Sequence, residues 1–159
     1  MKFQMALVPP SRPIDEAPDF ELDEDYDSLV MDTCGLLAQT DCVFRVAGFG
    51  QDPWPVDVSY DLSTVIEQLP EALSALRHKE PAQIDFYGQG VERLVRIVPR
   101  GESAIVTCVS NAGWVPMPSA EELPLVEAER LLVSLARDFK AALELVCPDI
   151  AALEVFAGW

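Results

Sequence analysis

The side chains that most often carry chemistry are few in this sequence and lie far apart. His78 is the only histidine, so any Ser-His-Asp or Cys-His site would have to use it. It follows an apolar helical pattern, a position where histidine more often complements the helix dipole. No serine stands in a GxSxG motif. The four cysteines are Cys34, Cys42, Cys108 and Cys147. They form no CxxC pair and have apolar neighbours, which favours buried free thiols.

The acidic residues form one pattern that resembles a metal site. Asp23, Asp25 and Asp27 alternate as they do at the start of a calcium loop. Ser28 stands where that loop requires glycine, and no glutamate occupies the twelfth position. We therefore expect no bound metal.

Nucleotide-binding and acid-base motifs are incomplete as well. The glycine pairs at 48–50 and 88–90 lack the remaining glycines and the following helix of a phosphate-binding loop. The paired acids Glu121 and Glu122 have the chemistry for acid-base work, but no motif marks a raised pKa. The sequence thus predicts no cofactor and no enzyme activity. A carboxylate-dependent enzyme of unknown reaction stays open as a second alternative.

Charge is the most unusual property of the chain. Its 159 residues include 27 Asp and Glu against 11 Lys and Arg, a formal net charge of −16. Between residues 15 and 32 there is no Lys or Arg and there are nine acids: Asp15, Glu16, Asp19, Glu21, Asp23, Glu24, Asp25, Asp27 and Asp32. Such a surface repels nucleic acid and anionic membranes and attracts basic proteins. We expect a basic protein partner; acidity that serves only solubility, in a solvated linker, is the plain alternative.

The N-terminal sequence bears on localisation. The apolar stretch from Phe3 to Val8 ends at Pro9-Pro10 and is shorter than the apolar region of a signal peptide, about 7–15 residues. No run approaches the ~20 apolar residues of a membrane span. We therefore expect a cytoplasmic protein.

The elements that must position any site follow from periodicity. Residues 83–109 predict three consecutive strands, with turns at 88–90 and 99–102. Further strands are expected at 42–49 and 56–60. Helical spacing predicts helices at 28–39, 62–76 and from Pro124 to residue 146, and a short one at 150–156. Pro70 should kink or split the second helix.

These elements predict an α+β fold in a single domain, with an antiparallel sheet of about five strands packed against two main helices. We divide the chain into an acidic, proline-rich N-terminal segment (1–27) and an α+β domain (28–159). Strand 91–98 carries apolar residues on both faces. The face away from the helices should therefore be covered by the N-terminal segment, by a second copy in a homodimer, or by a partner.

Three segments carry a resemblance to a known family: GFGQDPWPVDVSYDL (48–62), IDFYGQGVERLVRIV (84–98) and CVSNAGWVPMPSAEE (108–122). Together they resemble a small bacterial family of immunity proteins, which are encoded beside interbacterial toxins delivered by type VI or contact-dependent secretion. The resemblance spans roughly residues 42–145, and it assigns no catalytic residue. It implies an antitoxin-like inhibitor that binds one cognate toxin domain.

The charge suits that function, since an acidic inhibitor mimics phosphate in a basic active site. A cytoplasmic inhibitor implies a cytoplasm-acting toxin, such as a nuclease, an ADP-ribosyltransferase or a nucleotide pyrophosphokinase. An adaptor or chaperone for a basic secreted effector is the first alternative. The residues that we expect at the partner interface are Asp19, Glu21, Asp23, Glu24, Asp25, Tyr26, Asp27, Trp54 and Trp114.

Replacing Asp23, Glu24, Asp25 and Asp27 by Asn or Gln should weaken toxin binding and leave the fold intact. The reason is that long-range attraction depends on the charge of these groups. Binding kinetics at several salt concentrations would measure the loss, and circular dichroism would check the fold. Unchanged affinity would show that the segment is only a solvated arm.

Overall fold

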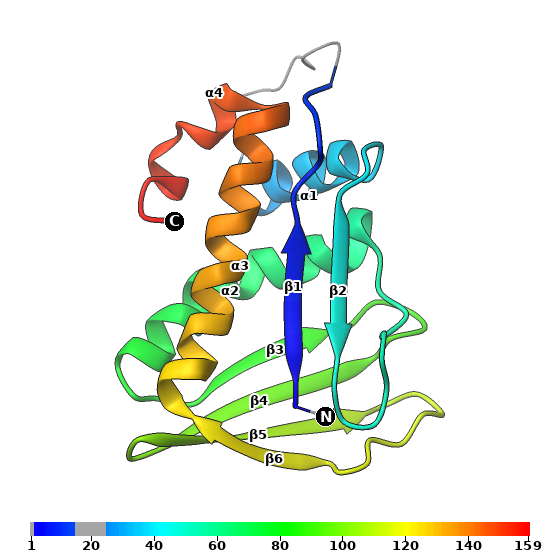
Figure 1. Cartoon of the computed structure of the whole chain (residues 1–159), viewed down its shortest axis with the longest axis vertical. Coiled ribbons are helices and arrows are strands. Elements are labelled where there is room, and N and C mark those ends of the chain that lie inside the picture. The colour runs from blue at the N-terminus through cyan, green and yellow to red at the C-terminus, as the bar shows by residue number, and fades with distance from the viewer. Residues whose placement is uncertain (1, 15–24) are drawn as a thin grey trace.

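The computed structural model describes residues 2–14 and 25–159. Two strands and the helices form an upper layer, and a four-stranded sheet lies below them (Figure 1). The strands are β1 (Gln4–Val8), β2 (Val43–Ala47), β3 (Ala82–Phe86), β4 (Arg93–Arg100), β5 (Ser103–Ser110) and β6 (Ala120–Pro124). The helices are α1 (Tyr26–Leu37), α2 (Ser63–Arg77), α3 (Leu125–Val146) and α4 (Pro148–Ala151), with a π-helical turn η1 (Val58–Leu62) and a 3-10 turn η2 (Glu154–Phe156).

The four-stranded sheet is antiparallel and runs in chain order, β3-β4-β5-β6. Its first three strands are the meander that the sequence predicts. No strand was expected between the meander and the helix predicted from Pro124. Strand β6 forms because Leu123 fits the buried face opposite Ala104, and because α3 begins only after Pro124.

A second sheet pairs β1 with β2 in antiparallel register. The side chains of Phe3, Met5 and Leu7 all lie in the core. Strand β1 therefore belongs to the folded domain, although it lies within the segment 1–27 that the sequence analysis set apart. The two sheets and the two long helices still make one compact α+β domain, as expected.

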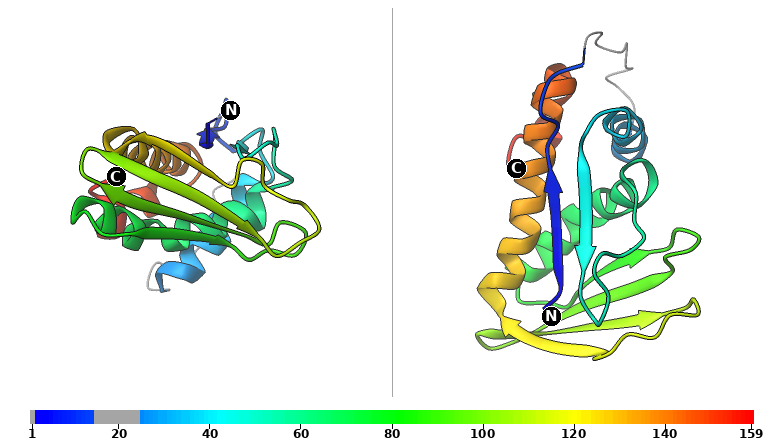
Figure 2. Two further views of the ribbon diagram at one scale, coloured as in Figure 1. Left: turned by 90° about the horizontal axis from the view of Figure 1, so that it is seen from below. Right: turned by 45° about the vertical axis from the view of Figure 1, so that its right-hand side comes forward.

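All helices and the β1-β2 ribbon lie on one face of the four-stranded sheet (Figures 1 and 2). The residues on its other face alternate with the buried ones. Leu94, Val98 and Ile105 are half-buried there and Val109 is 53% exposed. No described part of the chain covers this face, so a second copy or a partner as its cover stays a prediction.

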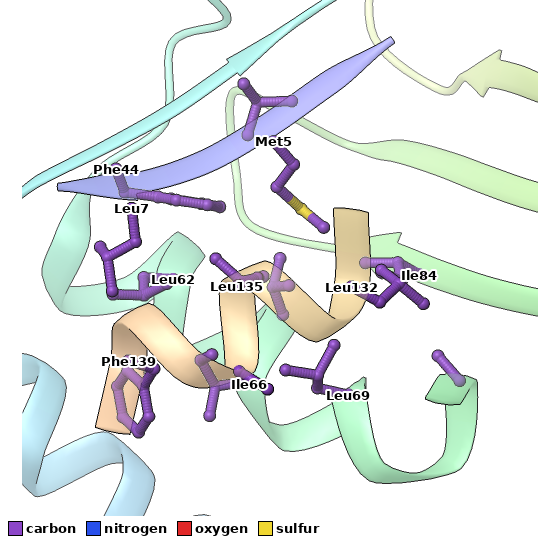
Figure 3. Close-up of a cluster of buried hydrophobic side chains, with 14 of the residues drawn as sticks. Met5, Leu7, Phe44, Leu62, Ile66, Leu69, Ile84, Leu132, Leu135 and Phe139 are labelled. Atoms are coloured by element: carbon purple, nitrogen blue, oxygen red, sulfur yellow. The ribbon is translucent and has the colours of Figure 1, made fainter. Parts of the chain in front are cut away.

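The core lies where the ribbon, α2, α3 and the sheet meet (Figure 3). Each element contributes large apolar side chains: Met5, Leu7 and Phe44 from the ribbon, Leu62 from η1, Ile66 and Leu69 from α2, Ile84 from β3, and Leu132, Leu135 and Phe139 from α3. The helical spacing of these residues in α3 is what places them on one face.

Two local expectations differ from the structure. The alternating run at 56–60 was expected to be a strand, but Asp57 instead caps a helical turn, since its carboxylate accepts from the backbone N–H groups of Tyr60 and Asp61. An aspartate in that position favours a helix start over a strand. Pro70 was expected to kink or split its helix, and α2 is not split there, since it runs from Ser63 to Arg77.

Leu132→Ala should lower the free energy of unfolding by about 2–5 kcal/mol, because it leaves a cavity at the centre of the core. Val133→Ala, one position along α3, is the matched control. Its side chain is 37% exposed, so we expect a change within about 0.5 kcal/mol. Urea denaturation would measure both, and equal effects would contradict the core assignment.

Candidate protein-binding surface

Three connecting loops meet at one end of the four-stranded sheet, at the right-hand side in Figure 1. They are residues 48–57, 87–92 and 111–119. The backbone N–H of Met117 donates to Phe49 O at 2.8 Å, and that of Asn111 donates to Glu92 O at 2.8 Å. These bonds join segments that are far apart in the sequence, so the three loops form one continuous surface.

A buried arginine holds these loops together. The side chain of Arg93 is only 2% exposed, and its Cζ atom lies 3.7 Å from the Trp114 ring centroid and 4.3 Å from that of Trp54. Its Nη2 donates to Gln51 Oε1 at 2.6 Å, whereas Nε and Nη1 have no hydrogen-bond acceptor among the described residues. Burial lowers the pKa of Arg93. A desolvated cation between two aromatic faces gains about 2 kcal/mol from each good contact.

The two tryptophans that we expected at an interface are thus brought together, with ring centroids 5.9 Å apart. Trp54 is 2% exposed and packs against Phe3 and Phe86. It belongs to the core and offers no surface to a partner. Prolines on both sides hold the ring rigidly, and a ring held in this way can pack into the core as well as lie at an interface. Trp114 is half-buried.

The sequence analysis did not single out Arg93. Its signal was present, because Arg93 shares a strand face with Val95 and Ile97, both buried. An arginine on a buried, apolar strand face needs neighbouring groups that compensate for the loss of water around its charge. The sequence does not say that these groups come from two distant loops.

The acidic part of the expected interface is only partly described. Asp19, Glu21, Asp23 and Glu24 lie outside the described residues. Asp25 caps α1, since its Oδ1 accepts from Ser28 N at 2.8 Å, and this bond lowers the pKa of Asp25. The side chain of Asp27 is exposed on the first turn of the same helix. Both acids lie at the start of α1, whereas the two tryptophans lie in the loops at the end of the sheet.

Tyr26 has a structural partner that explains the unbroken α2. Proline lacks the N–H that would bond to the carbonyl four residues earlier, which for Pro70 is that of Ile66. The hydroxyl of Tyr26 donates to Ile66 O at 2.6 Å. The Tyr26 ring is half-buried against Phe156 and Trp159. Burial raises the pKa of its hydroxyl, so it remains a donor.

Two further tyrosines lie exposed beside the loops. Tyr60 is 51% and Tyr87 48% exposed, and their rings meet edge-to-face with centroids 6.3 Å apart. The hydroxyl of Tyr87 donates to Glu67 Oε1, a bond that raises the pKa of Tyr87. Neither tyrosine was predicted as a site residue, because both fall in segments that were predicted as strands. Both do lie in the segments that carry the family resemblance.

Carboxylates fix the geometry of this surface. Asp61 is 6% exposed, and its Oδ2 accepts from Asp57 N at 2.8 Å. Burial is the main reason that the pKa of Asp61 is raised. Asp57 caps the same turn in return, so the pair holds Tyr60 in place. Among the described residues, no group of acids, histidines or cysteines is arranged to hold a metal ion.

The stretch of sequence that contains Asp57, Asp61 and Glu67 is strongly acidic. Between positions 13 and 76 the chain has fifteen acids and a single basic residue, Arg45. Arg45 pairs with Asp52. The side chains of Asp57, Glu67 and Glu71 take part in no ion pair that the described structure contains. The surface formed by η1 and the first half of α2 is therefore anionic.

The cysteines and the histidine lie in different environments. All four cysteines are buried and free, as expected, and burial raises the thiol pKa of Cys42, Cys108 and Cys147 to about 11. Such thiols are poor nucleophiles. His78 is exposed at the end of α2, with Nδ1 2.7 Å from Ser74 O. Within the described residues, no helix has the length and apolar character needed to cross a membrane.

Comparison of the chain with protein-family models, with curated proteins and with solved structures finds no match. The resemblance to immunity proteins therefore stays a prediction.

Tyr26→Phe should lower the free energy of unfolding by about 1–3 kcal/mol, because it leaves the Ile66 carbonyl without a donor. Tyr87→Phe removes an exposed hydroxyl and is the matched control, with an expected change within about 0.5 kcal/mol. In a Pro70→Ala background, residue 70 regains its N–H and the cost of Tyr26→Phe should fall by at least half. Denaturation of the four variants measures this, and an undiminished cost would refute the pairing.

Proposed function

We propose that this protein is an immunity protein that binds and neutralises a cognate antibacterial toxin acting in the cytoplasm. The toxin would be an enzyme that acts on nucleotides or nucleic acid, and the acidic surface would block its active site. The observation that carries the proposal is the uncompensated charge of residues 13–76. Part of this charge is held on η1 and α2 beside two exposed tyrosines.

Electrostatics supports an inhibitor of such an enzyme. A toxin that binds phosphate groups keeps a basic active site, and a strongly acidic protein is attracted to it over several ångströms. Steering of this kind raises association rates to about 10⁸–10⁹ M⁻¹s⁻¹ at low salt. The same charge disfavours nucleic acid and anionic membranes as direct partners.

Rigidity supports recognition through the loop surface. The loops are joined by backbone hydrogen bonds and by the buried Arg93. A surface that is already ordered loses little conformational entropy when it binds. A rigid surface of this kind favours tight binding.

Co-expression with the product of the neighbouring gene is the decisive experiment. The wild-type protein should restore growth of cells that express the toxin, and the purified pair should bind with nanomolar or tighter affinity. Association should slow as salt rises, because screening weakens long-range attraction beyond about 8–10 Å. Survival unchanged by this protein would refute the proposal. Stabilisation or export of the partner without protection would instead indicate the adaptor function.

A variant series would locate the inhibitory surface. Glu67→Gln together with Glu71→Gln removes two charges from α2 and should lower the association rate several-fold. Glu127→Gln together with Glu144→Gln removes two exposed charges from α3, neither of which is in a described ion pair, and is the matched control. Equal effects of the two pairs would show that only net charge matters.

A further inference from the structure

Two exposed tyrosines lie together in the described structure. In the part of the chain that the structure describes, Tyr60 and Tyr87 are the only exposed side chains among its Phe, Trp and Tyr residues, and they contact each other. They are 27 positions apart in the sequence, Tyr60 in η1 and Tyr87 in the loop at 87–92. Only the fold brings them together, and it leaves about half of each residue open to solvent.

A carboxylate lies at the same place. Glu67 accepts the hydroxyl hydrogen bond of Tyr87, which leaves its second oxygen without a described hydrogen bond. No described Lys or Arg forms an ion pair with it. The negative face of an aromatic ring and a carboxylate attract the same kind of group, a cation.

The two rings are held before any ligand arrives. The backbone N–H of Tyr60 is bonded to Asp57 Oδ1 at 2.7 Å, and its carbonyl accepts from Thr64 Oγ1 at 3.0 Å. Gly88 packs so closely on this turn that an added Cβ would lie 2.7 Å from Asp61 Oδ1 and 3.1 Å from the Tyr60 ring. A pre-formed pair of rings reduces the entropic cost of binding.

The geometry points to Tyr60, Tyr87 and Glu67 as a binding site for a cationic side chain of the partner protein, an arginine in particular. Guanidinium is planar, stacks on aromatic faces and donates to a carboxylate through two parallel N–H groups, which ammonium does not. The inference rests on the proposed function and deepens it. The toxin would place an arginine of its basic surface against the exposed tyrosine rings, with its guanidinium beside Glu67.

The site can be tested without the toxin. Chemical shifts of ¹³C-labelled tyrosine rings are followed by NMR while N-acetyl-arginine amide is added to the full-length protein. N-acetyl-citrulline amide, which has nearly the same shape and no charge, is the control ligand. The chain has three tyrosines, so Tyr26 is an internal reference. We expect saturable shifts of Tyr60 and Tyr87 with arginine, and at least tenfold weaker binding of citrulline.

Two matched variants separate this site from general acidity. Glu67→Gln should weaken arginine binding about fivefold, since a partly exposed ion pair contributes roughly 1 kcal/mol. Glu71→Gln makes the same charge change one turn further along α2, outside the site, and should have little effect. Equal weakening by the two variants, equal shifts with citrulline, or shifts of Tyr26 as large as those of Tyr60 would each overturn the inference.

These experiments distinguish failure of the arginine site from failure of the immunity function. If the wild-type protein fails to protect cells but binds arginine at Tyr60 and Tyr87, the site stands and the immunity function falls. If the wild-type protein protects and the double variant Tyr60→Ala, Tyr87→Ala protects equally well, the function stands and this site is refuted. Thermal unfolding of the double variant would check that it is folded.

Discussion

The burial of Arg93 between Trp54 and Trp114 is the constraint on which the loop surface depends. A guanidinium that is 2% exposed would be costly without compensation. Two ring faces and one bond to Gln51 offset that cost. Each compensating group comes from a loop that has no regular structure of its own, so satisfying one charge orders both loops. Strand β4, from which Arg93 projects, then joins this end of the sheet to the core.

A second polar compensation keeps the helical layer intact. Pro70 frees the Ile66 carbonyl inside α2, and the hydroxyl of Tyr26 from α1 occupies it. This bond and the aromatic contacts of Tyr26 with Phe156 and Trp159 connect α1, α2 and the C-terminal turn. Tyr26, which was expected at the acidic interface, is thus part of the packing inside the fold. Tyr60 and Tyr87 are the tyrosines that are about half exposed in the described structure.

In the function that we propose, charge and aromatic surface have different roles in recognition. The acids that outnumber basic residues between positions 13 and 76 would act at long range and favour a basic partner. The tyrosine pair would act at contact distance, where ring faces and one carboxylate favour a cation. The four-stranded sheet adds an apolar outer face with Val109 more than half exposed, a feature that the acidic surface does not explain.

The sequence alone determined the α+β class, the meander, the long helices and the buried free thiols, because period and turn chemistry act locally along the chain. It also determined the net charge, which is a sum over residues and needs no fold. The capping role of Asp57 is local, but the alternating run at 56–60 favoured a strand instead. Strand β6 and the Tyr26 bond to the Ile66 carbonyl in α2 were not predicted, since each depends on a partner distant in the sequence. The same holds for the candidate site. Only the tertiary structure buried Trp54, paired Tyr60 with Tyr87 and set Glu67 beside them, because residues at the ends of different strands and loops become neighbours only when the sheet forms.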